Sequence, residues 1–161
     1  MNSKLIFPAI ALATLAAVHA QPLILQGKSK ITVDAEAWSK LPHEDLTATG
    51  HDKKEHRYSG VAMAKLLEKI GAPAGDQLRG KAMTEAVLIT AADGYQIVFS
   101  LAELDASYRS NPVILADAAD GKPLEGNEGK LMLIVPGDAK HARWIRQVER
   151  IVLVSVQEPA S

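Results

Sequence analysis

The sequence has no cysteine among its 161 residues. This absence excludes disulfide bonds, zinc sites built on cysteine, iron–sulfur clusters and thiol nucleophiles. Aromatic residues are also scarce, at 4% of the chain, so any surface on which bases or sugars stack would be very sparse. The fold must therefore be stabilised by packing, without covalent cross-links.

An excess of positive charge is missing as well. The chain has 18 Lys and Arg residues against 19 Asp and Glu residues, which gives a formal net charge of −1. Nucleic-acid-binding domains usually carry a basic face and a high pI, so no nucleic-acid partner is expected. With 47% hydrophobic and 23% charged residues, the composition excludes a disordered chain, and the length predicts one domain.

The first twenty residues have the pattern of a secretory signal peptide. Lys4 is their only basic residue, residues 5–18 are apolar apart from one threonine, and small residues stand at Val18 and Ala20. We expect cleavage after Ala20 and a periplasmic or secreted protein. An uncleaved, membrane-anchoring helix is the alternative. No later segment has the roughly 18 uninterrupted apolar residues that a membrane span requires.

Residues 21–161 are expected to form a single domain, because they contain no repeat, no low-complexity tract and no linker. Strands outnumber helices and do not alternate with them regularly, which favours an α+β fold of mixed strands with a few short helices. The expected strands are residues 23–25, 31–33, 46–49, 86–92, 95–99, 113–116, 131–135 and 151–156, and the expected helices are residues 61–70 and 100–103.

A histidine-rich segment, residues 51–56, is one candidate site. His51 and His56 lie within six residues of each other together with two carboxylates. A metal site needs three or four converging ligands, and His43 or Asp52 could complete one here. The neighbouring lysines favour the alternative of a solvated, charged loop.

A second candidate is the segment at residues 140–146. His141, Arg143 and Arg146 surround Trp144, and arginine is suited to gripping an oxyanion or a phosphate with two hydrogen bonds. The alternative is a surface helix in which Trp144 fills the core. Asp93-Gly94-Tyr95 is readily explained as a tight hairpin turn.

Several motifs in register resemble the molybdopterin-binding domain of the sulfite oxidase family. They are similar, more closely, to the small exported single-domain proteins related to it. Residues 46–154 carry the resemblance. In chain order, the motifs are Tyr58-Ser59-Gly60-Val61 with Leu66-Leu67 and Gly71, Asp93-Gly94-Tyr95, Leu115-Ala116, Gly121-Lys122-Pro123-Leu124, and Leu131 to Pro136 followed by Arg143-Trp144.

The resemblance implies a pterin dithiolene cofactor whose molybdenum is bound by one protein cysteine. That cysteine would fall shortly before the Tyr58 motif, where this chain has residues 47–51 and no thiol. Ligation of molybdenum by a protein thiolate is therefore not expected here. Histidine or carboxylate ligands would not reproduce the electronic effect of a thiolate.

The resemblance also implies a concave site between the His51 loop, the Asp93 turn and the Arg143-Trp144 segment. For a pterin or another small anionic ligand, Arg143 would be the main phosphate contact. Asp93 would accept hydrogen bonds from ring N–H groups, and Tyr95 and Trp144 would wall the pocket. Lys140, His141 and Arg146 would be the supporting cations.

Two functional hypotheses follow, and the sequence leaves open whether the protein is an enzyme. In the first, the domain is a non-catalytic binding, sensory or accessory module that has lost the metal-ligating cysteine. In the second, it is an oxidoreductase or accessory subunit that still binds a molybdopterin or a metal through His51 and His56. A further expectation is a partner that is itself exported or membrane-anchored.

Overall fold

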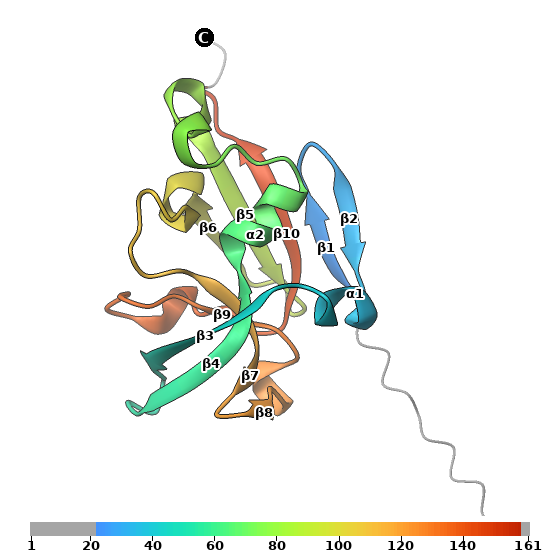
Figure 1. The fold of residues 1–161 in the computed structure, drawn as a ribbon, viewed down its shortest axis with the longest axis vertical. Helices are drawn as coiled ribbons and strands as arrows, with labels where there is room; N and C mark the ends of the chain where they lie inside the picture. Colours follow the sequence, from blue (N-terminus) through green and yellow to red (C-terminus); the bar gives the residue numbers. More distant parts are fainter. Residues whose placement is uncertain (1–21, 159–161) are drawn as a thin grey trace, which may run out of the picture.

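Two five-stranded sheets frame the core in the computed structural model, which describes residues 22–158 (Figure 1). The predicted signal peptide, residues 1–20, lies outside the described residues. The first sheet has the strand order β2-β1-β10-β5-β6, and the second has the order β3-β4-β7-β8, with β9 also paired to β7. Within the described part, no helix is long and apolar enough to cross a membrane.

The strands of both sheets are short. Those of the first sheet are β1 (Leu23–Gln26), β2 (Lys30–Val33), β5 (Glu85–Ala91), β6 (Gln96–Ser100) and β10 (Val148–Ser155). Those of the second are β3 (His43–Thr49), β4 (Glu55–Ala62), β7 (Ile114–Ala119), β8 (Lys122–Pro123) and β9 (Met132–Ile134). The predicted class, mixed strands with few helices, is confirmed.

The described residues contain two short α-helices and five 3₁₀ turns. They are α1 (Ala35–Ser39), α2 (Met63–Lys69), η1 (Gly75–Gln77), η2 (Gly80–Thr84), η3 (Leu101–Leu104), η4 (Gly126–Glu128) and η5 (His141–Arg143). The expected start of η3 is confirmed, since Ser100 and Glu103 form a capping box.

The chain closes the first sheet by pairing its two ends. β1 runs parallel to β10, with Leu25 opposite Ile151, while every other pair in this sheet is antiparallel. Inward-facing residues alternate with outward-facing ones along these strands, as the period of two predicts. The inner face of the sheet then packs on α2.

The prediction of a helix over residues 61–70 was wrong at its beginning. Val61 and Ala62 continue β4 and pair with Leu115 and Ile114 of β7, so the helix starts only at Met63. The spacing of apolar residues does not distinguish helix from strand at the beginning of this segment, and pairing with β7 makes it a strand. The whole of β4 was also missed, because its first half is charged and reads as a loop.

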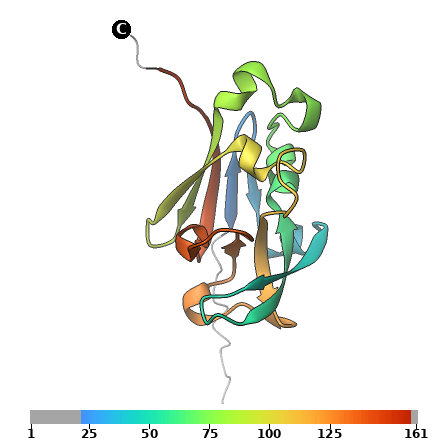
Figure 2. The same cartoon turned by 90° about the vertical axis from the view of Figure 1, so that its left-hand side faces the viewer.

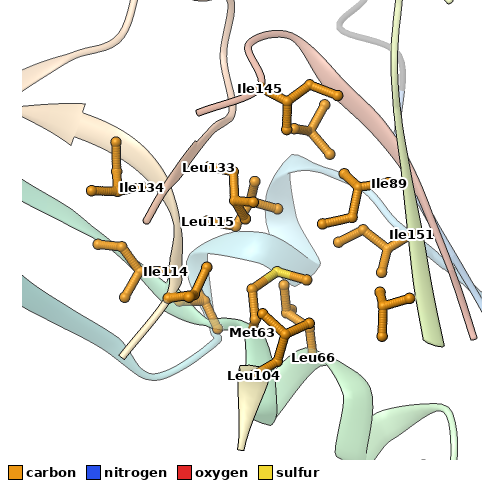
Figure 3. Packing of buried hydrophobic residues seen from close by; sticks show 14 of the residues in the cluster. Met63, Leu66, Ile89, Leu104, Ile114, Leu115, Leu133, Ile134, Ile145 and Ile151 are labelled. Atoms are coloured by element: carbon orange, nitrogen blue, oxygen red, sulfur yellow. The ribbon is translucent and has the colours of Figure 1, made fainter. Parts of the chain in front are cut away.

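One hydrophobic cluster fills the space between the sheets (Figure 3). Met63 and Leu66 of α2 lie between Ile114 and Ile134 on one side and Ile89 and Ile151 on the other. The labelled members are Met63, Leu66, Ile89, Leu104, Ile114, Leu115, Leu133, Ile134, Ile145 and Ile151.

Glycine is required at position 60, where β4 pairs with β7. A Cβ atom added to Gly60 would overlap the Leu115 carbonyl oxygen and lie 2.5 Å from the Cα atom of Ala116. Both neighbours are backbone atoms of a central strand, which cannot move aside as a flexible side chain would. The register shift between Ser59 and Gly60 falls at the same point.

We expect Gly60→Ala to lower the free energy of unfolding by about 2–3 kcal/mol, because the methyl group overpacks against backbone. Gly121→Ala is the matched control, since no atom lies within 4 Å of the added Cβ there and only the positive φ of +75° is strained. That control should lose about 1 kcal/mol. Urea denaturation measures both, and equal losses would contradict the steric explanation.

Candidate functional site

The turn between β3 and β4 meets η5 at one side of the molecule. His141 Nε2 lies 3.0 Å from the Thr49 carbonyl oxygen, and the ring centroids of His51 and His141 are 4.6 Å apart. In Figure 1 the orange η5 turn lies beside the arrowhead end of β3. Two segments about ninety residues apart in the chain are thereby joined.

Trp144 fills the core directly behind these histidines. Its side chain is buried, and its Nε1 donates to the Val135 carbonyl oxygen at 3.0 Å. Its ring centroid lies 4.4 Å from that of His141, 5.8 Å from that of Tyr58 and 6.2 Å from that of His51, each pair in a T-shaped arrangement. Trp144 is thus the structural centre of the site, as the core-filling alternative predicts.

The β5–β6 turn approaches η5 from the other side. Tyr95 Oη donates to the Ala142 carbonyl oxygen at 3.0 Å, and Asp93 Oδ1 accepts from the Tyr95 backbone N–H at 2.9 Å. A groove of about 420 Å³ opens between this turn and the segment that follows η5. It is lined by Ala91, Asp93, Tyr95, Asn127, Trp144, Ile145, Arg146 and Gln147.

A strained backbone shapes the floor of this groove. Gln147 has a φ of +52°, which is rare for a residue with a side chain. The strain is held by three hydrogen bonds: Gln147 N–H to Glu128 at 3.1 Å, Ala92 N–H to Gln147 at 2.9 Å, and Gln147 Nε2 to Asn127 at 3.2 Å. Such strain often marks a functional position.

Arg143 and Arg146 have different surroundings although they are three residues apart in the chain. The Arg143 guanidinium binds Asp138 with Nε at 2.8 Å and Nη2 at 2.7 Å, and Glu103 with Nη1 at 2.8 Å. It also lies 4.3 Å from the centre of the Phe99 ring. The arginine ion pairs within residues 22–158 involve Arg57 and Arg143 and not Arg146, which lines the groove.

These ion pairs neutralise the charge of Arg143, although part of its side chain stays exposed. Asp138 and then Glu103 raise the pKa of Arg143 above the usual range of arginine. Burial opposes ionisation of Glu103, but the contacts with Arg143 and Ser100 together lower its pKa. An Arg143 contact with phosphate, as predicted from the sequence, would compete with the two carboxylates for the same guanidinium. The contact stays a prediction, and Lys140 remains an exposed residue just before η5.

His51 in the β3–β4 turn and His56 near the start of β4 have different environments. Burial, followed by the charge of Arg146, lowers the pKa of His51 and favours its neutral form. His56 instead lies between two carboxylates, with Nδ1 2.6 Å from Asp120 and Nε2 3.0 Å from Asp52, which raise its pKa. Burial also raises the pKa of Tyr58 to about 12, so the phenol stays protonated.

No group of three or more histidine, aspartate or glutamate side chains suited to a metal ion occurs among residues 22–158. Both ring nitrogens of His56 lie within hydrogen-bond distance of carboxylates, and both donate when the ring is protonated. His43 lies apart from this site, against Trp38 and Asp117. Metal binding by His51 and His56 stays a prediction.

Sequence reasoning missed Asn127, Glu128 and Gln147. None belongs to a recognised motif, and positive φ at a glutamine leaves no mark in the sequence. Gly129 is the one local signal, since a Cβ atom there would lie 2.5 Å from Gln147 Cγ and 3.0 Å from its Cα. The three main segments expected at the site, in contrast, do come together around η5.

We expect Arg143→Gln to lower the free energy of unfolding by about 2 kcal/mol, because Asp138 and Glu103 would keep their charges without a partner. Arg143→Lys should recover only part of this loss, since an ammonium group cannot bind both oxygens of Asp138 in the same plane. Arg150→Gln, at an exposed position, is the control. Urea denaturation measures the free energy of unfolding of all three variants. A value for Arg143→Gln equal to that of the wild type would contradict the structural role of Arg143.

Stability should also depend on the protonation of His56. Its pKa is raised in the folded state above the ordinary 6.5, so its stabilisation is complete below that value and is lost as pH rises through the raised pKa. Thermal melts should therefore show a larger fall between about pH 6 and pH 8.5 in the wild type than in His56→Gln. Parallel pH profiles for the two proteins would contradict this role of His56.

Comparison with known proteins assigns the chain to a family. Residues 28–160 match the model of the oxidoreductase molybdopterin binding domain. The sulfane dehydrogenase SoxCD from Paracoccus pantotrophus has a similar structure, with a TM-score of 0.65 and 18% identity over 84% of this chain and 38% of that chain. No curated protein sequence matches the chain. The chain belongs to the oxidoreductase molybdopterin-binding domain family, as the order of its motifs predicts.

Proposed function

We propose that the protein is an exported, non-catalytic binding module of the molybdopterin-binding fold, with a sensory or accessory role. Its ligand is a small anionic molecule held in the groove beside Arg146. The observation that carries the proposal is the chemistry of the β3–β4 turn. The resemblance puts the molybdenum-ligating cysteine within residues 47–51, and this segment contains no thiol.

The side chains around this turn do not fit molybdenum bound by a protein thiolate. The Thr49 carbonyl oxygen is bonded to His141, and Gly50 has no side chain to offer. The ring of His51 packs beside His141, with the edge of Trp144 nearby. Imidazole is a harder ligand than thiolate and would not replace its electronic effect, so loss of that chemistry is the simpler explanation.

The groove has the groups that an anionic, planar ligand requires. Arg146 supplies a cation free of ion pairs with the other described residues, and arginine binds phosphate or carboxylate through two parallel hydrogen bonds. Tyr95 supplies a ring at the wall, and the Asp93 carboxylate can accept N–H groups. A volume of about 420 Å³ is within the range of small-molecule sites.

Export rests on the pattern of residues 1–20 and agrees with the absence of cysteine. A chain without thiols neither gains nor loses cross-links in an oxidising compartment. A soluble ligand of that compartment, or a partner that is itself exported or membrane-anchored, would then be the physiological target.

A second candidate function is an oxidoreductase or accessory subunit that still carries a metal or molybdopterin. The neutral form of His51, 4.6 Å from the ring of His141, favours it because a neutral imidazole can act as a metal ligand. His56 supports it less, since both of its ring nitrogens are engaged with carboxylates.

The test is to purify the protein from its native compartment, analyse its metals, and identify by mass spectrometry the small molecules released on denaturation. We expect molybdenum far below one equivalent in the wild type and in His51→Ala, and an anionic small molecule in the wild type. Arg146→Gln should lose most of that molecule, by about tenfold or more for one charge-assisted contact.

Arg150→Gln is the matched control, because it removes the same charge from an exposed position in β10, away from the groove. It should retain the ligand. Stoichiometric molybdenum-pterin in the wild type would overturn the non-catalytic proposal. Stoichiometric metal that disappears in His51→Ala would support the second function instead, and equal ligand loss in both arginine variants would remove the groove as the site.

A further inference from the structure

The free edges of the two sheets are not equally protected against pairing with another chain. Edge strands are commonly blocked by charged residues or proline. β2 carries Lys30, β3 carries His43, Glu44 and Asp45, and β8 consists of Lys122 and Pro123. The outer side of β9 is covered, since Leu133 N–H donates to the Ile145 carbonyl oxygen.

β6 is the exception among the described strands. It reads Gln96-Ile97-Val98-Phe99-Ser100, with no charge and no proline, and it ends the first sheet next to β5. Figure 2 shows β6 along the outer border of the molecule. The Val98 side chain is 56% exposed, the second highest exposed fraction among the large exposed hydrophobic residues.

In the hydrogen-bond pattern of the β5–β6 hairpin, the backbone N–H and C=O groups of Val98 point away from β5. Ala91 N–H donates to the Tyr95 carbonyl oxygen next to the turn. Hydrogen-bonded pairs alternate along an antiparallel ladder, so Ile97 and Phe99 bond to β5 while Val98 presents its N–H and C=O to the free edge. Ser100 N–H is already bonded to Glu103, which limits the pairing length at that end.

The Val98 side chain extends an apolar row on the outer face of the first sheet. Val98 lies opposite Leu88, which in turn lies opposite Val152, and the latter two are half-buried. A strand added beside β6 would lengthen this row and cover Val98. Strands paired edge to edge gain both ladder hydrogen bonds and cross-strand side-chain contacts.

Polar and apolar residues are arranged symmetrically along β6 on either side of Val98. An antiparallel copy centred on Val98 sets valine against valine, Ile97 against Phe99, and Gln96 against Ser100. Apolar residues then meet apolar ones and polar residues meet polar ones, as an interface with a two-fold axis requires. We infer that β6 is a dimerisation edge, at which two copies of this chain join their first sheets antiparallel through Val98.

Such a dimer closes on itself. The other edge of the joined sheet is β2 in each copy, where Lys30 opposes further pairing. Because one short strand buries less than a standard interface, we expect a dissociation constant on the order of 10–100 μM.

The inference is tested by sedimentation equilibrium across this concentration range. The wild type should shift from one to two chains, and Val98→Asp and Val98→Lys should each remain monomeric because like charges would face each other across the axis. An equimolar mixture of the two variants should form dimers again. Thr32→Asp is the matched control, since it adds the same charge to an exposed position on the opposite edge strand, and it should dimerise normally.

A readout without mutation guards against variants that fail to fold. Hydrogen exchange at the Val98 amide of the wild type should slow as protein concentration rises, while Gln26 and Thr32 stay unchanged. A wild type that is monomeric at about 1 mM would overturn the inference. So would a Val98→Asp dimer as stable as the wild type, or a mixture of the two charged variants that stays monomeric.

Discussion

The buried indole of Trp144 is the interaction on which the candidate site depends. Its Nε1 donates to the carbonyl oxygen of Val135, the residue directly after β9. This bond ties the end of β9 to the segment that leads into β10. Its ring packs in T-shaped arrangements with those of His51, Tyr58 and His141. With this one side chain in place, the β3–β4 turn, η5 and the groove share a fixed relative position.

Residues on either side of the indole take opposite roles because of what surrounds them. Arg143 turns toward η3 and is neutralised by Glu103 and Asp138, so its charge stabilises the fold. Arg146 turns to the groove, where strain at the next residue, Gln147, holds the backbone. A charge committed to ion pairs contributes little to ligand binding, whereas a cation without such partners can bind an anion at lower cost.

The β3–β4 turn links the candidate site to the scaffold that carries it. Residues 49–51 still contact η5 through the Thr49 carbonyl oxygen and the His51 ring. His56, five positions after His51, instead bridges Asp52 and Asp120 and fastens the turn to the β7–β8 connection. One histidine lies in the site and the other stabilises the scaffold that carries it.

The sequence by itself determined the class of fold, the order of the motifs, most strands, the capping box at Ser100 and the absence of any thiolate ligand. These follow from composition and from patterns within a few residues. Only the tertiary structure decided that the charged segment 55–62 is a strand, which arginine faces the groove, and where each histidine lies. Those outcomes depend on partners far apart in the chain, such as Arg143 with Glu103 and His56 with Asp120. Local periodicity carries no information about such partners, because the packing of the sheets brings them together.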